Sequence, residues 1–312
     1  MARVALISTG HMEWEGLGPA LDRLFPGNEF VAVGPGPLDS LTSCDAHLLL
    51  RKVNKPGRKD NNADRLIQRA ALEAMKSKRG ERFDLVVIVD DLELENVAHP
   101  DVVCNVVRSA VDRHLAQAHF DPDLRSRTAE RLRAAVSFHL AKPMIESWVF
   151  ADSSGPTNAG VPPERLARLQ AGLDPEDFAT DDPTYDAANE SLCACWLALS
   201  AAKQKNHKVQ WVARGNERVR HPKAYMAWLC LDPRAKTCSA YRESSEGAAA
   251  LSRLNWEEVL GPQRDRMPFL RSLIDDLADG LGQEPAIGVL HITGAPETCR
   301  LTLPADPCLR NL

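Results

Sequence analysis

Three carboxylates follow the most apolar run of the chain. The run from Leu85 to Val89 contains no polar residue, and Asp90, Asp91 and Glu93 come directly after it. Such a run is typical of a strand buried on both faces, in a parallel sheet covered by helices. Ligands of these sheets bind beyond the carboxyl ends of the strands, and carboxylate oxygens suit Mg²⁺. The sequence predicts a hard-cation site there; the alternative is a solvated acidic turn in which Asp90 caps the following helix.

A second acidic pair, Glu13 and Glu15, follows the first predicted strand, Val4 to Thr9. We place the pair in a loop that precedes a short helix from Gly16 to Phe25. Loops after neighbouring parallel strands open at one edge of the sheet, so these glutamates can face the acidic strand tip. Converging carboxylates repel one another unless a cation or basic groups neutralise them. The pattern therefore predicts a divalent-metal site. His11 is a candidate proton shuttle, or otherwise an ordinary loop histidine.

Strands that alternate with helices indicate an α/β fold with a mostly parallel sheet. A second strand is expected at Phe30 to Val33 and another at Ala134 to Leu140. Helical spacing marks Ala63 to Lys78 and Val102 to Leu115. Beyond a Ser-, Gly- and Pro-rich stretch at 153–163, the chain is predicted to be mainly helical. The main helices there are expected at 187–202, 222–231, 245–254 and 267–281.

Three segments resemble a known fold. They are 8–13 (Ser-Thr-Gly-His-Met-Glu), 89–91 (Val-Asp-Asp) and 143–152 (Pro-Met-Ile-Glu-Ser-Trp-Val-Phe-Ala-Asp). Their order is similar to that of the Toprim domain, the metal-binding fold of topoisomerases, primases and nucleases of the OLD type. More narrowly, these segments and His-Pro-Lys-Ala-Tyr at 221–225 resemble an uncharacterised Toprim-related family of bacterial proteins. Members of that family often sit beside ATPase genes in phage-defence loci.

The resemblance implies a Toprim-like α/β domain over residues 1–152. Residues 153–312 then form a mainly helical C-terminal region, which can pack on the first as one unit. It also implies Mg²⁺- or Mn²⁺-dependent phosphodiester cleavage, in which the metal polarises a phosphoryl oxygen and activates water. Candidate catalytic residues are Glu13, Asp90 and Asp91. Glu15 and Glu93 join these three as candidate metal ligands.

One residue departs from the Toprim pattern. The family has a glutamate directly before the first loop glycine, and this chain has Thr9 before Gly10. A hydroxyl neither acts as a general base at neutral pH without activation nor neutralises a cation. Either Glu13 or Glu15 takes over, or the domain is a scaffold that binds metal weakly or not at all.

Glu146 lies in a segment whose apolar residues cover nearly every side of the expected helix, so it is expected to be partly buried. A buried carboxylate needs a partner. Lys142 or Arg133 could pair with it, or it could take part in the metal site. We treat Glu146, like His11, as a residue that supports the metal ligands.

The net charge of −5 conceals two basic stretches. Residues 51–82 hold eleven Lys and Arg against four Asp and Glu, and residues 203–223 hold seven against one. Such patches on an acidic protein favour an anionic partner. The candidate nucleic-acid-binding residues are Arg51, Lys52, Lys55, Arg58 and Lys59. For Arg65, Arg69, Lys76 and Lys78 the alternative is a solvated helix face.

The bulk composition is that of an ordinary globular protein, with 44% hydrophobic and 26% charged residues. No run approaches the length of a membrane span, and no signal peptide precedes the first strand, so a cytoplasmic protein without membrane contact is expected. The eight cysteines show no zinc spacing.

Two functional hypotheses remain open. The first is a metal-dependent nuclease that acts on RNA or DNA as the effector of an anti-phage defence system, together with a partner ATPase. The second is a catalytically inactive Toprim-like subunit that binds nucleic acid or the ATPase. Self-association into a homo-oligomer is left open under both.

Overall fold

The computed structural model describes most of the chain. The described residues are 1–42, 45–48, 61–76, 82–117, 121–188, 197–206, 212, 214–231, 241–261, 266–288 and 307–312.

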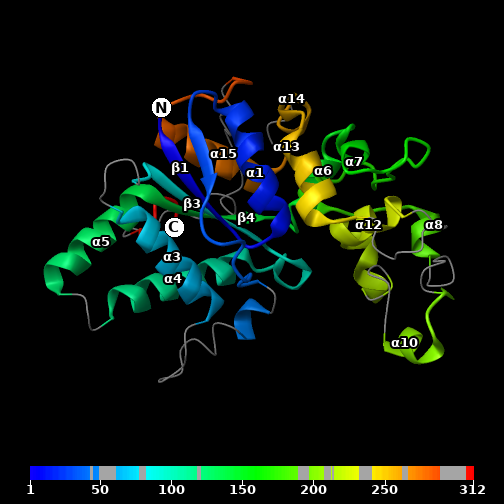
Figure 1. Cartoon of the computed structure of the whole chain (residues 1–312), viewed down its shortest axis with the longest axis horizontal. Coiled ribbons are helices and arrows are strands. Elements are labelled where there is room, and N and C mark those ends of the chain that lie inside the picture. Colours follow the sequence, from blue (N-terminus) through cyan, green and yellow to red (C-terminus); the bar gives the residue numbers. More distant parts are fainter. Residues whose placement is uncertain are drawn as a thin grey trace.

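A sheet of four parallel strands forms the centre of the α/β fold (Figure 1). The strands stand in the order β2-β1-β3-β4, and their bounds are β1 Arg3–Ser8, β2 Glu29–Ala32, β3 Leu85–Asp91 and β4 Val136–Ala141. Because β1 and β3 are the two central strands and Ser8 pairs with Val89, the turn after β1 lies beside the acidic tip of β3.

Helices cover both faces of the sheet (Figure 1). Alternate residues of β3 point to opposite faces, since side chains in a strand alternate. Val87 and Val89 pack with α1 (His11–Leu24) and α15 (Pro268–Leu281). Val86 and Ile88 pack on the other face, against helices α3 (Asn62–Ala74), α4 (Pro100–Leu115) and α5 (Pro122–Ala135). All residues of β3 except Asp91 are buried, as its apolar run predicts.

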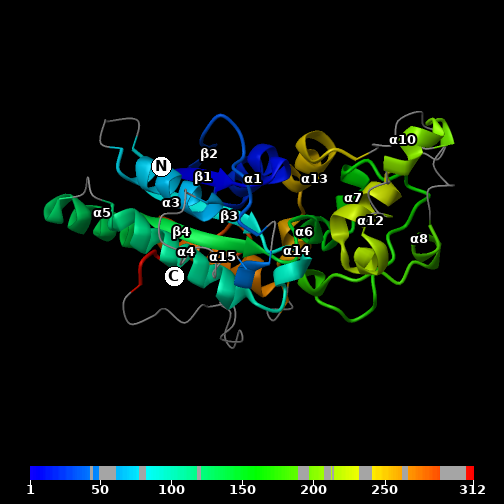
Figure 2. The ribbon, with the colours of Figure 1, turned by 90° about the horizontal axis from the view of Figure 1, so that it is seen from below.

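The second half of the chain is mainly short helices at the end of the molecule toward which the strands run (Figure 2). They are α6 Glu146–Phe150, α7 Gly155–Asn158, η2 Pro175–Asp177, α8 Pro183–Asp186, α10 Ala201–Asn206, η4 Gly215–Arg220, α12 Pro222–Leu229, η5 Glu243–Gly247, α13 Ala248–Ser252 and α14 Trp256–Val259. A further short helix, η1 Leu94–Asn96, follows β3. One apolar cluster contains β1, α1, α12, α13 and α15, so residues from both sides of position 152 share a core.

The first helix differs from its prediction. Residues 11–15, which we expected to form a loop, are helical, and α1 begins at His11 rather than at Gly16. Met12 and Leu17 are buried on its inner face, and Glu13 stands in the first turn, where a carboxylate interacts favourably with the helix dipole. Gly16 lets α1 approach α13 closely, because a Cβ at this position would overlap the backbone of Ala248.

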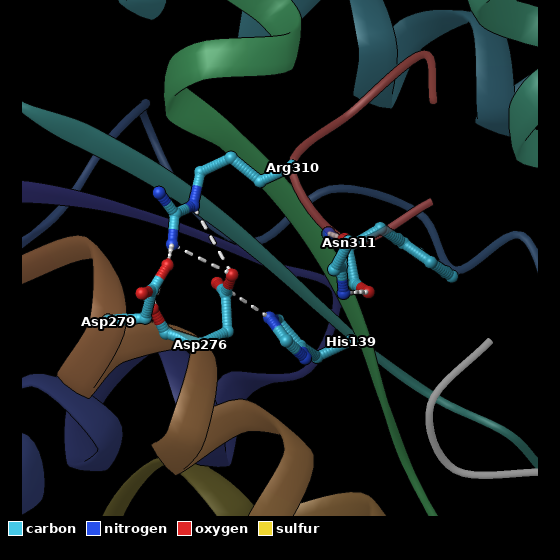
Figure 3. A network of polar contacts seen from close by, with 6 residues as sticks. His139, Asp276, Asp279, Arg310 and Asn311 are labelled. Carbon is cyan, nitrogen blue, oxygen red and sulfur yellow. Dashed lines mark hydrogen bonds and ion pairs between the residues drawn. The ribbon is translucent and has the colours of Figure 1, made fainter. Parts of the chain in front are cut away.

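The last described residues close the outer edge of β4 (Figure 3). Asn311 pairs with both backbone groups of Phe138, accepting from its N–H at 3.0 Å and donating to its carbonyl at 2.7 Å. Arg310 bonds Asp276 of α15, and the same aspartate bonds His139 of β4 at 3.2 Å. The chain end thereby pairs part of the edge strand, whose outer backbone groups would otherwise be unpaired. No helix among the described residues is long and apolar enough to span a bilayer.

Candidate functional site

Asp90 is a structural anchor at the tip of β3. It is fully buried, and it accepts hydrogen bonds from the hydroxyl of Thr9, from the N–H of Leu41 at 3.1 Å and from the hydroxyl of Thr42 at 3.4 Å. Burial raises the pKa of Asp90 to about 6, and these hydrogen bonds oppose the rise. The residue thus ties the end of β1 and the loop after β2 to β3. Thr9, directly before Gly10, bonds this aspartate through its hydroxyl.

Asp91 faces the other way. Its Oδ1 accepts a hydrogen bond from the N–H of Ile145 at 2.9 Å, just before α6. Burial raises its pKa well above the ordinary value, and the charges of Glu13, Glu146 and Glu93 add to the rise. Asp91 therefore belongs to a group of carboxylates that Asp90 does not join.

Glu93 has an unusual backbone conformation. Its φ of 59° and ψ of 155° lie in a region that residues other than glycine rarely adopt. The N–H of Glu93 donates to the carbonyl of Pro143 at 2.8 Å, which fixes the turn beyond β3. Burial raises the pKa of Glu93 to about 7, although the cations of Lys223 and Arg214 oppose the rise.

Glu13 projects from the first turn of α1 and is 2% exposed. Its carboxyl group lies against Gly10, where a Cβ would overlap it, so a larger residue at this position would require the Glu13 side chain to shift. Among the described residues, Glu13 Oε1 has no hydrogen-bond partner. Burial raises the pKa of Glu13 to about 8, and the charge of Glu146 contributes.

Glu146 lies at the centre of the group. It begins α6, is 2% exposed, and accepts a hydrogen bond from the hydroxyl of Tyr241 at 3.2 Å, while its Oε2 has no partner among the described residues. Burial raises its pKa. Its charge also acts on Glu13, Asp91 and Glu93. The expected partner Lys142 instead pairs with Asp177, at 2.7 Å.

One ammonium group stands among these carboxylates. Lys223, in the first turn of α12, pairs with Glu243 at 2.5 Å. Burial lowers the pKa of Lys223, but the carboxylates of Glu146 and Glu243 outweigh burial and raise it. We call Glu13, Asp91, Glu93, Glu146, Glu243 and Lys223 the carboxylate cluster. It holds five acidic groups and one cation.

Sequence reasoning missed Lys223, Tyr241 and Glu243. A signal for Lys223 was present, because a lysine in the first turn of a helix opposes the helix dipole and needs compensation. Tyr241 and Glu243 belong to a polar stretch without periodicity, and only the tertiary structure brings them to Glu146.

The remaining predicted residues lie elsewhere. Glu15 and His11 are exposed on α1, away from the buried Glu13. Arg51, Lys52, Lys55, Arg58, Lys59 and Lys78 lie outside the described residues. On α3, Arg69 and Lys76 both pair with the buried Glu73, at 2.8 and 2.5 Å. Arg65 pairs with Asp39 at 3.0 Å. These three cations stabilise the helix face.

The donor set of the cluster suits a hard cation, since it is made of carboxylate oxygens and two of them are buried without a partner. Unpartnered buried carboxylates are costly, and a divalent ion would compensate them. In the described part of the chain, however, no three His, Cys, Asp or Glu side chains form a group arranged to hold a metal ion. Ligation by three carboxylates would therefore require side-chain rotation.

Comparisons of the chain with protein-family models, with curated proteins and with solved structures found no match.

Proposed function

We propose that the protein is a metal-dependent nuclease that hydrolyses phosphodiester bonds of RNA or DNA at the carboxylate cluster. The observation that carries the proposal is the pair of buried, unpartnered oxygens, Glu13 Oε1 and Glu146 Oε2, beside Asp91. The resemblance of the strand tip and of segment 143–152 to Toprim proteins supports the same activity. It also supports a cytoplasmic role as an anti-phage effector with a partner ATPase.

The residues divide into distinct roles in this proposal. Asp91 and Glu146 would hold Mg²⁺ or Mn²⁺, with Glu93 at the exposed side. When bound, the cation supplies Lewis-acid polarisation of the phosphoryl oxygen and a lower pKa for water. Glu13 Oε1 is free to accept a proton from the attacking water. Glu243 holds Lys223 in place, and the Lys223 ammonium can stabilise the negative charge that develops on the phosphate.

The test is an assay with labelled RNA and DNA in the presence of Mn²⁺ or Mg²⁺. The protein should degrade one of the two, and Glu146→Gln should reduce the rate at least a hundredfold. Glu73→Gln is the matched control, since Glu73 is another buried glutamate but is paired with Arg69 and Lys76 on α3. Equal loss in both variants, or full activity of Glu146→Gln, would contradict the proposal.

A second function has specific support. Asp90 is fully engaged by Thr9, Leu41 and Thr42, and Lys223 partly neutralises the cluster. These features fit a subunit that has lost catalysis and binds nucleic acid or a partner ATPase. For that function, the purified chain would show no hydrolysis with any divalent cation, and a pull-down would recover an ATPase whose activity requires this chain.

A further inference from the structure

Four basic residues lie within the short segment 214–223, and they differ in whether they contact other described residues. Lys223 is paired with Glu243. Arg218 lies over the ring of Tyr185, at 5.5 Å, and donates to the carbonyl of Ala188 at 2.7 Å. Arg214 and Arg220 are exposed, and neither forms an ion pair with another described residue. Two of the four cations therefore serve the fold, and two are available to a ligand.

The two exposed arginines lie at the two ends of η4, which leads into the carboxylate cluster. Arg214 directly precedes η4, which leads through His221 into α12 and Lys223. The charge of Arg214 acts on Glu93, the cluster residue with the strained backbone. In Figure 2, α12 lies beside α6, which carries Glu146, beyond the ends of the strands. The η4 segment therefore packs beside α12, the helix that contributes Lys223 to the cluster.

Helix dipoles explain only part of this concentration of positive charge. Arg220 ends the short η4, where a cation is favourable, whereas Lys223 stands in the first turn of α12, which contains no acidic residue. Cations near a helix N-terminus are unfavourable by a few tenths to about 1 kcal/mol each. The carboxylates offset this cost for Lys223, whereas no described carboxylate pairs with Arg220.

We propose that Arg214 and Arg220 bind the phosphodiester backbone of the nucleic acid that enters the carboxylate cluster. This inference rests on the proposed nuclease function and adds the surface that receives the substrate. Guanidinium groups bind phosphate oxygens through two parallel hydrogen bonds, and such contacts give affinity without reading sequence. The substrate thus reaches the cluster over η4, in the second basic stretch of the sequence.

The test is fluorescence anisotropy with labelled 20-nucleotide RNA and DNA strands over a range of KCl concentrations, in a metal chelator. Arg214→Glu combined with Arg220→Glu should weaken binding at least tenfold and reduce the salt slope by about two. The control is Arg125→Glu combined with Arg127→Glu, which makes the same change of charge on exposed residues of α5, at the opposite end of the molecule (Figure 1). It should bind like the unchanged protein.

Three results would overturn the inference: no binding by the unchanged protein, binding by the η4 variant within twofold of it, or an equal loss in the α5 control. Because the chelator prevents metal-dependent cleavage, the outcome does not depend on the nuclease assay. A protein that binds through Arg214 and Arg220 but never cleaves would contradict the proposed function alone. Arg214→Gln and Arg220→Gln, which are milder changes, should each give a smaller loss of affinity.

Discussion

Asp90 and Asp91 are neighbours in the chain, but their side chains serve opposite faces of the sheet. Asp90 Oδ2 accepts from the N–H of Leu41 at 3.1 Å, whereas Asp91 Oδ1 accepts from the N–H of Ile145 at 2.9 Å. Strand alternation causes this division. One aspartate holds the loop after β2, and the other joins Glu13 and Glu146.

Substitution of the two aspartates should therefore separate stability from activity. Asp90→Ala leaves three donors, from the end of β1 and from the loop after β2, without an acceptor, and we expect a loss of about 2–3 kcal/mol in the free energy of unfolding. Asp91→Asn keeps an acceptor for Ile145 and should change stability by less than about 1 kcal/mol, while hydrolysis is abolished. Urea unfolding and the nuclease assay measure the two effects. Similar stability losses in both variants would contradict the division.

Much of the fold could be predicted from the sequence, because apolar runs and helical spacing report burial directly. The run from Leu85 to Val89 is a central parallel strand, and the helix expected at 267–281 is α15, Pro268–Leu281. The start of α1 could not be predicted in this way. Its first turn carries polar residues, and the burial of Glu13 depends on packing against the sheet.

The candidate site was only partly predictable. The sequence places Glu13 and the tip of β3 at one edge of the sheet, since parallel neighbours end together. It cannot show that Thr9 and Thr42 bind Asp90, or that Tyr241 reaches Glu146, because these contacts join residues distant in the chain. The long-range partners decide which carboxylates remain free.

Neutralising Glu13 should stabilise the metal-free protein. Glu13 is buried and its Oε1 has no described partner, so the ionised carboxylate is costly. At pH 8 in a chelator, Glu13→Gln should raise the free energy of unfolding by about 1–3 kcal/mol, and hydrolysis should fall. Thermal and urea unfolding measure the change. A destabilised Glu13→Gln protein would show that the carboxylate has a structural partner.

Replacement of Lys223 should destabilise the protein, which is the opposite of the effect expected for Glu13→Gln. Its ammonium is the cation among the buried carboxylates, and it pairs with Glu243 at 2.5 Å. Breaking a partly buried ion pair leaves its partner uncompensated, so Lys223→Met should cost about 1–2 kcal/mol. Adding Glu243→Gln should restore part of this loss. If the double variant is no more stable than Lys223→Met, the pair is not the source of the effect.

Glu176 should make the stability of the protein depend on pH, independently of the carboxylate cluster. It is buried and accepts from the N–H groups of Phe269 and Leu270, at 2.9 and 2.8 Å, at the start of α15. Burial raises its pKa from 4.5 to about 8, despite these bonds and the nearby Lys142, and Asp174 adds to the rise.

A raised carboxyl pKa means that the folded state binds the proton more tightly than the unfolded state. The stabilisation is complete below pH 4.5 and is lost as the pH rises toward 8. Relative to Glu176→Gln, the unchanged protein should lose stability between pH 5 and pH 8 in urea unfolding. A constant difference between the two proteins over this range would contradict the raised pKa.

Calorimetric titration with Mn²⁺ tests the central claim most directly, because it measures whether the carboxylate cluster binds a divalent cation. We expect one Mn²⁺ to bind per chain, with binding lost in Glu146→Gln and retained in the control Glu73→Gln. Absence of Mn²⁺ binding, or undiminished binding by Glu146→Gln, would contradict a metal site at Glu146 and Asp91.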